Sequence, residues 1–200
     1  MLEKVIFLDI EGVLQPGTQV SFEHIRAGDV PELYKELAQR TGVDYNKHNI
    51  YDVTAVYYDW EDSAVNELRR ILDTTGAKIV LSSSWKENGF ECMRDLMHIY
   101  DLHDYLVDFT PTIEYGRHLE VIKELQLPER TDIRSVEILS YLHDHPEVKY
   151  YVVIDDIPLG KDLGEHFVEI YPSLTEELAD VCIKTLQIRR GTARSSCPRT

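Results

Sequence analysis

The stretch KVIFLDIEGVL, residues 4–14, decides the fold of this chain of 200 residues. It begins with an apolar run that has the length of a short buried strand, and Asp9 and Glu11 follow directly. In open α/β sheets, ligands bind outside the carboxyl ends of the strands. An Asp at such an end can act as a nucleophile or as a ligand of a hard cation. We therefore expect Asp9 to lie in a functional site.

Two further apolar runs end on polar residues in the same way. Residues 149–154, KYYVVI, lead into Asp155 and Asp156, and residues 78–81, KIVL, lead into three serines at 82–84. Carboxylates delivered at the same end of two buried strands predict a metal site. A hydroxyl cluster followed by a helix can bind phosphate through the hydroxyls and the free N–H groups of the helix.

Strands and helices are expected to alternate along the chain, which is typical of a mostly parallel sheet between helical layers. The remaining strands are predicted at residues 105–109 and 166–170. The helices are predicted at about residues 31–40, 62–75, 119–123, 135–143 and 175–186. The sequence thus predicts a doubly wound, Rossmann-like α/β domain over residues 1–188, with a small helical insertion at about 15–60. A basic tail, residues 189–200, is predicted to be disordered.

Aromatic residues cluster in or just after the predicted insertion: Tyr45, Tyr51, Tyr57, Tyr58 and Trp60. Such a cluster can form a minor core or a surface that stacks a nucleobase. The core role is favoured, above all for Tyr51 and Trp60, because aromatic side chains bury a large area with or without a ligand. Tyr57 and Tyr58 are adjacent and would point to opposite faces of an extended segment, so at most one would face a cleft.

Composition restricts the function classes. The 36 acidic and 21 basic residues give a net charge of −15, which disfavours non-specific binding to duplex nucleic acid. No apolar run approaches the ~20 residues of a membrane span, and the N-terminus lacks the pattern of a secretory signal. We therefore expect a cytoplasmic protein without a membrane partner. The three cysteines have no short metal-ligand spacing, which argues against structural zinc.

The strand ends resemble the motifs of the haloacid dehalogenase-like (HAD) superfamily. Its first motif is an apolar strand followed by Asp-x-Asp-Gly, its second is a strand that ends on a hydroxyl, and its fourth is a strand followed by acids. Residues 4–14, 78–84 and 149–156 match these three motifs. A more specific likeness lies in residues 74–86, Thr110-Pro111, Arg134 before Glu137-Ile138, and Ile154-Asp155-Asp156. Together they look like the HAD domains associated with nucleic-acid repair proteins, and the resemblance covers most of the chain.

The resemblance implies a Mg²⁺-dependent phosphatase that works through an aspartyl-phosphate. It implies that Asp9 is the nucleophile, Glu11 the acid and base, Ser83 the hydroxyl that binds the phosphoryl group, and Arg134 the cation that the superfamily usually supplies as Lys. Arg is a reasonable substitute because its fork suits phosphate.

The remaining ligands follow from the same resemblance. Mg²⁺ would be held by Asp9, Asp155 and Asp156 together with the backbone carbonyl of Glu11. The phosphate-binding candidates are Ser83, Ser84, Arg134 and Lys86, with Ser82 as an alternative hydroxyl and Arg130 or Lys123 as alternative cations. The expected substrate is a phosphorylated small molecule or a nucleotide, and the repair-protein likeness extends this to a polynucleotide end.

Glu11 departs from the usual second Asp of the first motif and leaves alternatives open. The added methylene displaces the carboxyl by roughly 1 Å, and a misplacement of that size can lower a rate about a hundredfold. One alternative is a catalytically weakened module that binds phosphate and metal. The other is a phosphotransferase, in which an alcohol takes the place of water. The sequence makes no prediction of the oligomeric state.

Overall fold

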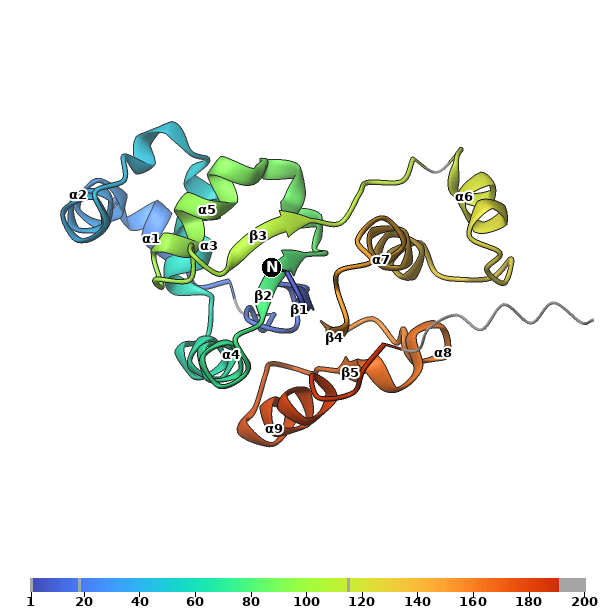
Figure 1. Ribbon diagram of the computed structural model, residues 1–200. Helices are drawn as coiled ribbons and strands as arrows, with labels where there is room; N and C mark the ends of the chain where they lie inside the picture. Colours follow the sequence, from blue (N-terminus) through green and yellow to red (C-terminus); the bar gives the residue numbers. More distant parts are fainter. Residues whose placement is uncertain (1, 18, 115, 191–200) are drawn as a thin grey trace, which may run out of the picture.

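A computed structural model describes residues 2–17, 19–114 and 116–190 (Figure 1). Its centre is a parallel sheet of five strands in the order β3-β2-β1-β4-β5. The strands are β1 (Lys4–Leu8), β2 (Lys78–Leu81), β3 (Leu106–Phe109), β4 (Tyr150–Asp155) and β5 (Phe167–Glu169). Leu8 of β1 pairs with Leu81 of β2 and with Ile154 of β4. The three strands singled out by their polar ends are therefore neighbours, and their carboxyl ends meet at one edge of the sheet.

Helices occupy most of the connections between the strands. The α-helices are α1 (Ser21–Ala27), α2 (Val30–Thr41), α3 (Ile50–Tyr58), α4 (Asp62–Thr75), α5 (Phe90–His98), α6 (His118–Glu124), α7 (Ile133–Asp144), α8 (Gly160–Leu163) and α9 (Glu176–Thr185). The described residues also form the 3₁₀ turns η1 (Tyr45–Lys47), η2 (Ser84–Asn88) and η3 (Gly164–His166). The predicted doubly wound α/β fold is confirmed, and the predicted strands and helices agree with these bounds to within a few residues.

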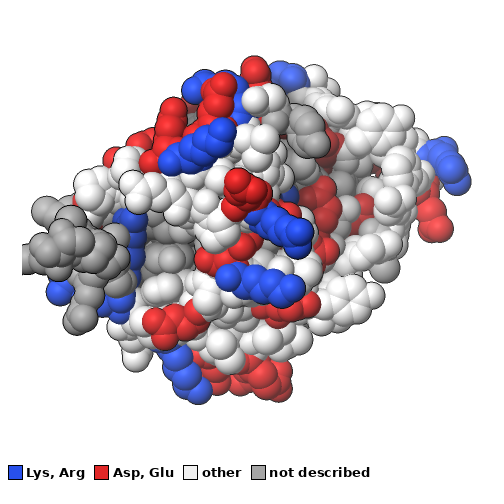
Figure 2. Space-filling view, turned by 90° about the vertical axis from the view of Figure 1, so that its right-hand side faces the viewer, with Lys and Arg blue, Asp and Glu red and all other residues white. Residues whose placement is uncertain are grey.

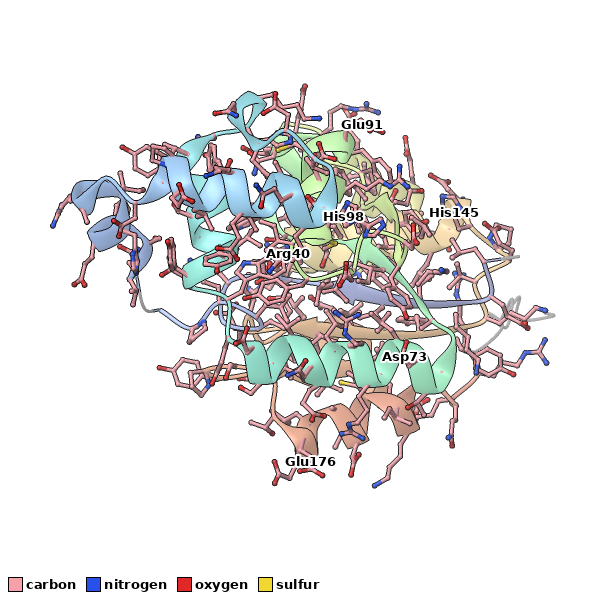
Figure 3. All side chains as sticks on the ribbon, turned by 90° about the vertical axis from the view of Figure 1, so that its left-hand side faces the viewer. Arg40, Asp73, Glu91, His98, His145 and Glu176 are labelled. Carbon is pink, nitrogen blue, oxygen red and sulfur yellow. The ribbon has the colours of Figure 1, made fainter. Side chains whose placement is uncertain are left out.

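The two faces of the sheet contribute to two cores because successive strand residues point to opposite sides. Ile6 and Leu8 belong to the larger core with α4, α5 and α9, whereas Val5 and Phe7 belong to a core with α7 and α8. Figure 1 shows α4 and α5 on one side of the sheet and α7 and α8 on the other. In Figure 3, where the left-hand side of Figure 1 faces the viewer, α4 and α9 run next to each other. Arg70 Nη1 of α4 contacts Asp180 Oδ1 of α9 at 2.8 Å.

The segment between β1 and α4 folds into three helices, α1 to α3. Tyr45 and Trp60 are buried there, so the core role predicted for Trp60 is confirmed. The core role predicted for Tyr51 is wrong, because its side chain is 53% exposed. Its ring lies 5.9 Å between centroids from that of Phe22 of α1. Residue 51 lies in the first turn of α3, whose buried residues are Val53, Thr54 and Val56.

The argument that placed Tyr57 and Tyr58 on opposite faces is also wrong, because α3 continues to Tyr58 and the segment is not extended. In a helix, adjacent side chains are separated by about 100° of rotation. Both rings are half-buried and meet each other edge to face at 4.8 Å. Tyr58 also stacks on His24 of α1 at 3.8 Å, which joins the ends of the insertion.

The predicted basic tail lies mostly outside the described residues, since residues 191–200 are not described. Of its first two residues, Arg189 forms an isolated bridge with Tyr150, and Arg190 Nη1 donates a hydrogen bond to the Leu142 carbonyl at 2.7 Å. Across the described ranges, no helix combines the length and the apolar character that crossing a membrane requires.

Candidate active site

Three carboxylates gather where β1 and β4 end. β4 ends at Asp155, and the Asp9 N–H donates to the Ile154 carbonyl at 3.0 Å, which extends the β1–β4 ladder by one residue. Asp9, Asp155 and Asp156 each offer an oxygen within 4.8 Å of the other two. Asp9 and Asp155 are buried, at 3% and 0% exposure, and Asp156 is exposed. The sheet thus brings together the acids that the sequence placed at the ends of two distant strands.

Arg134 connects the two buried acids. It lies in the first turn of α7, where Asp132 caps the helix by accepting the Arg134 N–H at 2.8 Å. Its Nη1 donates to Asp9 Oδ1 at 2.8 Å and to Asp155 Oδ2 at 2.9 Å. We call this group of three residues the arginine bridge. The alternative cations, Arg130 and Lys123, are exposed, and neither forms an ion pair within the described ranges.

The positive charge of Arg134 does not fully offset the burial and the mutual repulsion of Asp9 and Asp155. Burial and the neighbouring charge of Asp9 raise the pKa of Asp155 to about 7, against the opposing effect of Arg134. Burial likewise raises the pKa of Asp9 above its ordinary value. Burial acts to lower the pKa of Arg134, but the two acids outweigh it and the pKa is raised. A single guanidinium nitrogen shared by two carboxylates leaves the pair suited to a further cation.

Gly12 allows the chain to turn sharply beside Asp156. Its φ is +72°, and a Cβ atom there would lie 2.5 Å from Asp156 Oδ2. The Leu14 and Gln15 N–H groups both donate to the Ile10 carbonyl, which closes the turn. Any larger residue at position 12 would be strained and would displace Asp156. The turn therefore fixes the position of Glu11 next to the acid cluster.

Glu11 is held by two donors from the β2 side of the edge. Ser83 Oγ donates to Glu11 Oε2 at 3.1 Å, and Trp85 Nε1 donates to Glu11 Oε1 at 2.7 Å. We call these three residues the Glu11 clamp. Ser83 caps η2, and its Oγ also accepts the Trp85 N–H at 3.4 Å. The predicted acid/base residue and the predicted phosphate-binding hydroxyl are therefore in direct contact.

The other serines lie in different surroundings. The Ser82 N–H donates to the Leu8 carbonyl at 2.9 Å, and its Oγ is buried with no partner among the described residues. The Oγ of Ser135, next to Arg134, is also buried with no partner among the described residues. Ser84 is exposed as the first residue of η2. Of the three serines after β2, only Ser83 hydrogen-bonds Glu11.

Lys86, a predicted phosphate ligand, is engaged elsewhere. Its Nζ contacts Glu137 Oε2 at 2.6 Å, and both side chains are nearly buried. It also donates to Thr110 Oγ1 and to the Pro111 carbonyl, each at 3.2 Å. Glu137 Oε1 accepts the Ile113 N–H at 3.0 Å. The pair joins η2, the segment after β3 and α7, so the charge of Lys86 is balanced by Glu137 rather than left free for a ligand.

Sequence reasoning assigned no role to Trp85 or to Glu137. The signal for Glu137 was an acid inside the apolar run of a helix, which requires a partner when it is buried. Trp85 carried a weaker signal, its place two residues after Ser83. Its contact with Glu11 spans 74 positions and cannot be read from local spacing.

The acid cluster fits a divalent cation such as Mg²⁺. Its side-chain donors are carboxylate oxygens, which hard cations prefer. The close approach of Gly12 to Asp156 leaves no room for a side chain that would separate the acids. Asp155 Oδ1 accepts the Ile157 N–H at 2.9 Å, which orients this carboxylate while Arg134 orients that of Asp9.

The surface beside α6, α7 and α8 carries charges of both signs. Figure 2 shows Lys and Arg side chains interspersed with Asp and Glu on this face. The drawn part of this face therefore offers no continuous basic surface for a polyanion. That the protein does not bind duplex nucleic acid non-specifically stays a prediction.

Comparison with known proteins gives one match that covers most of the chain. A family model described as "HAD domain in Swiss Army Knife RNA repair proteins" matches residues 5–179. A shorter stretch of 79 residues, 40% of this chain, is 29% identical to the 4-diphosphocytidyl-2-C-methyl-D-erythritol kinases of Acinetobacter baumannii strains ATCC 17978 and ACICU. It spans 28% of each kinase, so the activity of those enzymes carries no weight here. No solved structure matches this chain significantly.

Proposed function

Because this chain belongs to the family of HAD domains in Swiss Army Knife RNA repair proteins, we propose that it is a Mg²⁺-dependent phosphomonoester hydrolase that forms an aspartyl-phosphate on Asp9. The observation that carries the proposal is the arginine bridge, in which one nitrogen of Arg134 contacts Asp9 and Asp155 at 2.8 and 2.9 Å. Family membership supports a hydrolase in general terms. The bridge supports Asp9 as the specific nucleophile, since it orients a buried carboxylate at the edge where ligands bind.

The proposed metal ligands are the side chains of Asp9, Asp155 and Asp156, with the backbone carbonyl of Glu11. When bound, Mg²⁺ supplies positive charge that reduces the repulsion between an ionised carboxylate and an anionic phosphate. The side chains of the site do the remaining work. Arg134 holds the Asp9 carboxylate and contacts the phosphoryl oxygens, and the Ser83 hydroxyl donates to one of these oxygens.

In the first proposed step, a carboxylate oxygen of Asp9 attacks phosphorus in line with the leaving group. The new bond joins this oxygen to phosphorus, and the bond from phosphorus to the leaving oxygen breaks. Glu11 gives a proton to that oxygen, which leaves as an alcohol. In the second step, Glu11 takes a proton from water while the water oxygen attacks phosphorus. The bond to Asp9 then breaks, which releases inorganic phosphate and restores the carboxylate.

The proposed substrate is a nucleotide or the phosphorylated end of an RNA strand. The support is the description of the family as a domain of RNA repair proteins. The net charge of −15 favours an end-specific contact over binding along a polyanion. A cytoplasmic location is part of the proposal, since Cys92 and Cys182 form no disulfide within the described residues, as expected in a reducing compartment.

The test is release of inorganic phosphate from an aryl phosphate and from oligoribonucleotides that carry a 5′- or 3′-phosphate. Each is measured with Mg²⁺ and with a chelator, for the native protein and Asp9→Asn. We expect turnover that needs Mg²⁺ and that is lost in the variant. Turnover in the chelator, or full activity of Asp9→Asn, contradicts the covalent mechanism.

A second candidate is a module that binds phosphate and metal without turnover. The observation that favours it is the Glu11 clamp, because both oxygens of the carboxylate needed for proton transfer are already bound by other residues. Glu11→Asp separates the two candidates. If the native protein is inert toward a broad panel of phosphates and Glu11→Asp gains activity, the protein is a binding module. If the native protein is active, it is a hydrolase.

A further inference from the structure

Each oxygen of the Glu11 carboxylate is bound by a different residue. Trp85 Nε1 contacts Oε1 at 2.7 Å, the shorter of the two bonds, and Ser83 Oγ contacts Oε2 at 3.1 Å. Both donors are neutral and the acceptor can be charged, an arrangement that gives hydrogen bonds stronger than neutral pairs. The two contacts together determine the direction in which the Glu11 side chain leaves its turn.

The two donors are not equivalent in a phosphatase. A serine hydroxyl has a single proton to donate, so Ser83 cannot donate to Glu11 and to a phosphoryl oxygen at the same time. In the proposed reaction Ser83 turns to the phosphoryl group, and Glu11 Oε2 loses its donor. The indole N–H of Trp85 is a donor only, and it remains on Oε1. Trp85 is then the residue that keeps Glu11 in place during proton transfer.

The indole of Trp85 is itself held by the core. Its ring lies 6.2 Å from that of Trp60, which is buried and stacks on Tyr100 at 5.9 Å with an interplanar angle of 7°. Trp85 is only partly exposed. An aromatic ring packed in this way has few rotamers available, so the direction of its N–H is fixed before a substrate arrives.

The extra methylene of Glu11 fits this geometry. The Gly12 turn fixes the backbone of residue 11, and the side chain must cross from β1 to η2 to reach the indole. An Asp at this position would be one methylene shorter and would fall short of a 2.7 Å contact. The structure thus gives a reason for Glu where related phosphatases are expected to have Asp.

We propose that Trp85 is a positioning residue for Glu11, and that the length of Glu11 is matched to the indole N–H of Trp85. The catalytic consequence rests on the proposed phosphatase function. The contact between Trp85 and Glu11 does not depend on that function, and it is measured separately.

The contact is tested by NMR on the full chain labelled with ¹⁵N-tryptophan. The chain has two tryptophans, so two indole N–H signals are expected, and Trp60→Phe assigns them. We expect Glu11→Gln and Glu11→Asp each to shift the Trp85 signal and to leave the Trp60 signal in place. An unchanged Trp85 signal in both variants overturns the proposal, whether or not the protein is a phosphatase.

The positioning role is tested by kinetics with two kinds of leaving group. Protonation matters greatly for an alkyl alcohol and little for p-nitrophenol, which leaves readily as an anion. Trp85→Phe is therefore expected to lower kcat/KM, which reports only the step in which the leaving group departs, about tenfold for an alkyl phosphate and less than about twofold for p-nitrophenyl phosphate. In a Glu11→Gln background, Trp85→Phe should cause no further loss, because the two residues act as one unit.

Trp60→Phe is the matched control, since it keeps an aromatic ring next to Trp85 and removes only an indole N–H that has no partner among the described residues. It is expected to lower the melting temperature and to leave the ratio of kcat/KM for the alkyl and aryl phosphates unchanged. Equal losses of kcat/KM on both substrates in Trp85→Phe, or a second loss in the Glu11→Gln background, overturn the positioning role. If the native protein hydrolyses neither substrate, the proposed function fails, and the indole signals alone decide whether Trp85 positions Glu11.

Discussion

Asp9 at the sheet edge and Asp59 at the end of the α1–α3 insertion are equally buried, each at 3% exposure, but their surroundings differ. Asp59 accepts the Ser21 N–H at 3.0 Å and the Ser21 hydroxyl at 2.5 Å. Its burial is thus matched by neutral donors that fasten α1 to the end of α3. Asp9 faces a second buried acid and shares one nitrogen of Arg134 with it. Burial alone does not distinguish a reactive carboxylate, whereas a buried neighbour of the same charge does.

The largest expected effect separates these two acids. Asp9→Asn should lower kcat by at least about 10³-fold, because it removes the nucleophile, without lowering the melting temperature. Asp59→Ala should keep kcat within about threefold and reduce the free energy of unfolding by ~1–3 kcal/mol, because it leaves the buried Ser21 N–H without an acceptor. Thermal unfolding and phosphate release measure both quantities. The comparison breaks down if Asp9→Asn loses stability and Asp59→Ala loses turnover.

The next effect concerns Arg134. Arg134→Ala should lower kcat about a hundredfold, the loss typical of a removed charge-stabilising donor. Arg134→Lys should retain kcat within about tenfold of native, because both acid contacts use the single nitrogen Nη1 and do not need the guanidinium fork. Steady-state kinetics of the two variants give the answer. Equal losses in both would mean that the fork itself is required.

A smaller effect is expected at Gly12, with Gly42 as its matched control. Both have positive φ, +72° and +77°, but only at Gly12 would a Cβ atom meet another group, Asp156 Oδ2 at 2.5 Å. Gly42→Ala should reduce the free energy of unfolding by ~1–2 kcal/mol through backbone strain alone. Gly12→Ala should show this loss and also weaken the stabilisation by Mg²⁺. Melting curves with and without Mg²⁺ compare the two variants. Equal responses to Mg²⁺ would show that Asp156 is not a ligand of the metal.

The smallest effect is a dependence of stability on pH. The pKa of Asp155 is raised to about 7 in the folded protein, above its value in the unfolded chain. The folded protein therefore binds more protons between pH ~4 and 7, and stability falls as pH rises through this range. In a chelator, the melting temperature should fall by a few degrees from pH 5.5 to 8. Asp155→Asn should flatten this fall, and Mg²⁺ should stabilise the native protein more at pH 8 than at pH 5.5.

That pH dependence has its own control in Asp59→Ala, which leaves the sheet edge intact. It should show the same slope between pH 5.5 and 8 as the native protein. A flattened slope in Asp59→Ala, or an unchanged slope in Asp155→Asn, would assign the dependence to another group.

Much of the sheet could be predicted from the sequence, because a buried parallel strand is a short apolar run and its end is marked by the first polar residue. Residues 4–8 and 78–81 were predicted as the strands observed, and the gathering of Asp9 and Asp155 followed from their places at strand ends. The place of Arg134 beside them was implied by the family resemblance alone. The insertion was harder to predict, since α1 and α3 are short and their aromatic residues fit either a core or a surface.

The contacts that the side chains of η2 make with distant elements could not be predicted. Trp85 meets Glu11 across 74 positions, and Lys86 meets Glu137 across 51. Each depends on the angle at which η2 leaves β2, which the local sequence does not determine. The side chains of Lys86 and Trp85 are adjacent in sequence and yet serve different parts of the molecule, one between β3 and α7 and the other at Glu11.

The central claim is that Asp9 forms a covalent bond to phosphorus. The most direct measurement incubates the protein and Mg²⁺ with a ³²P-labelled phosphomonoester, stops the reaction with acid and maps the label by proteolysis and mass spectrometry. We expect the label on the peptide that contains Asp9, at a higher level in Glu11→Gln, where hydrolysis of the intermediate is slowed. Turnover of the native protein with no label on Asp9 in either protein would contradict the claim.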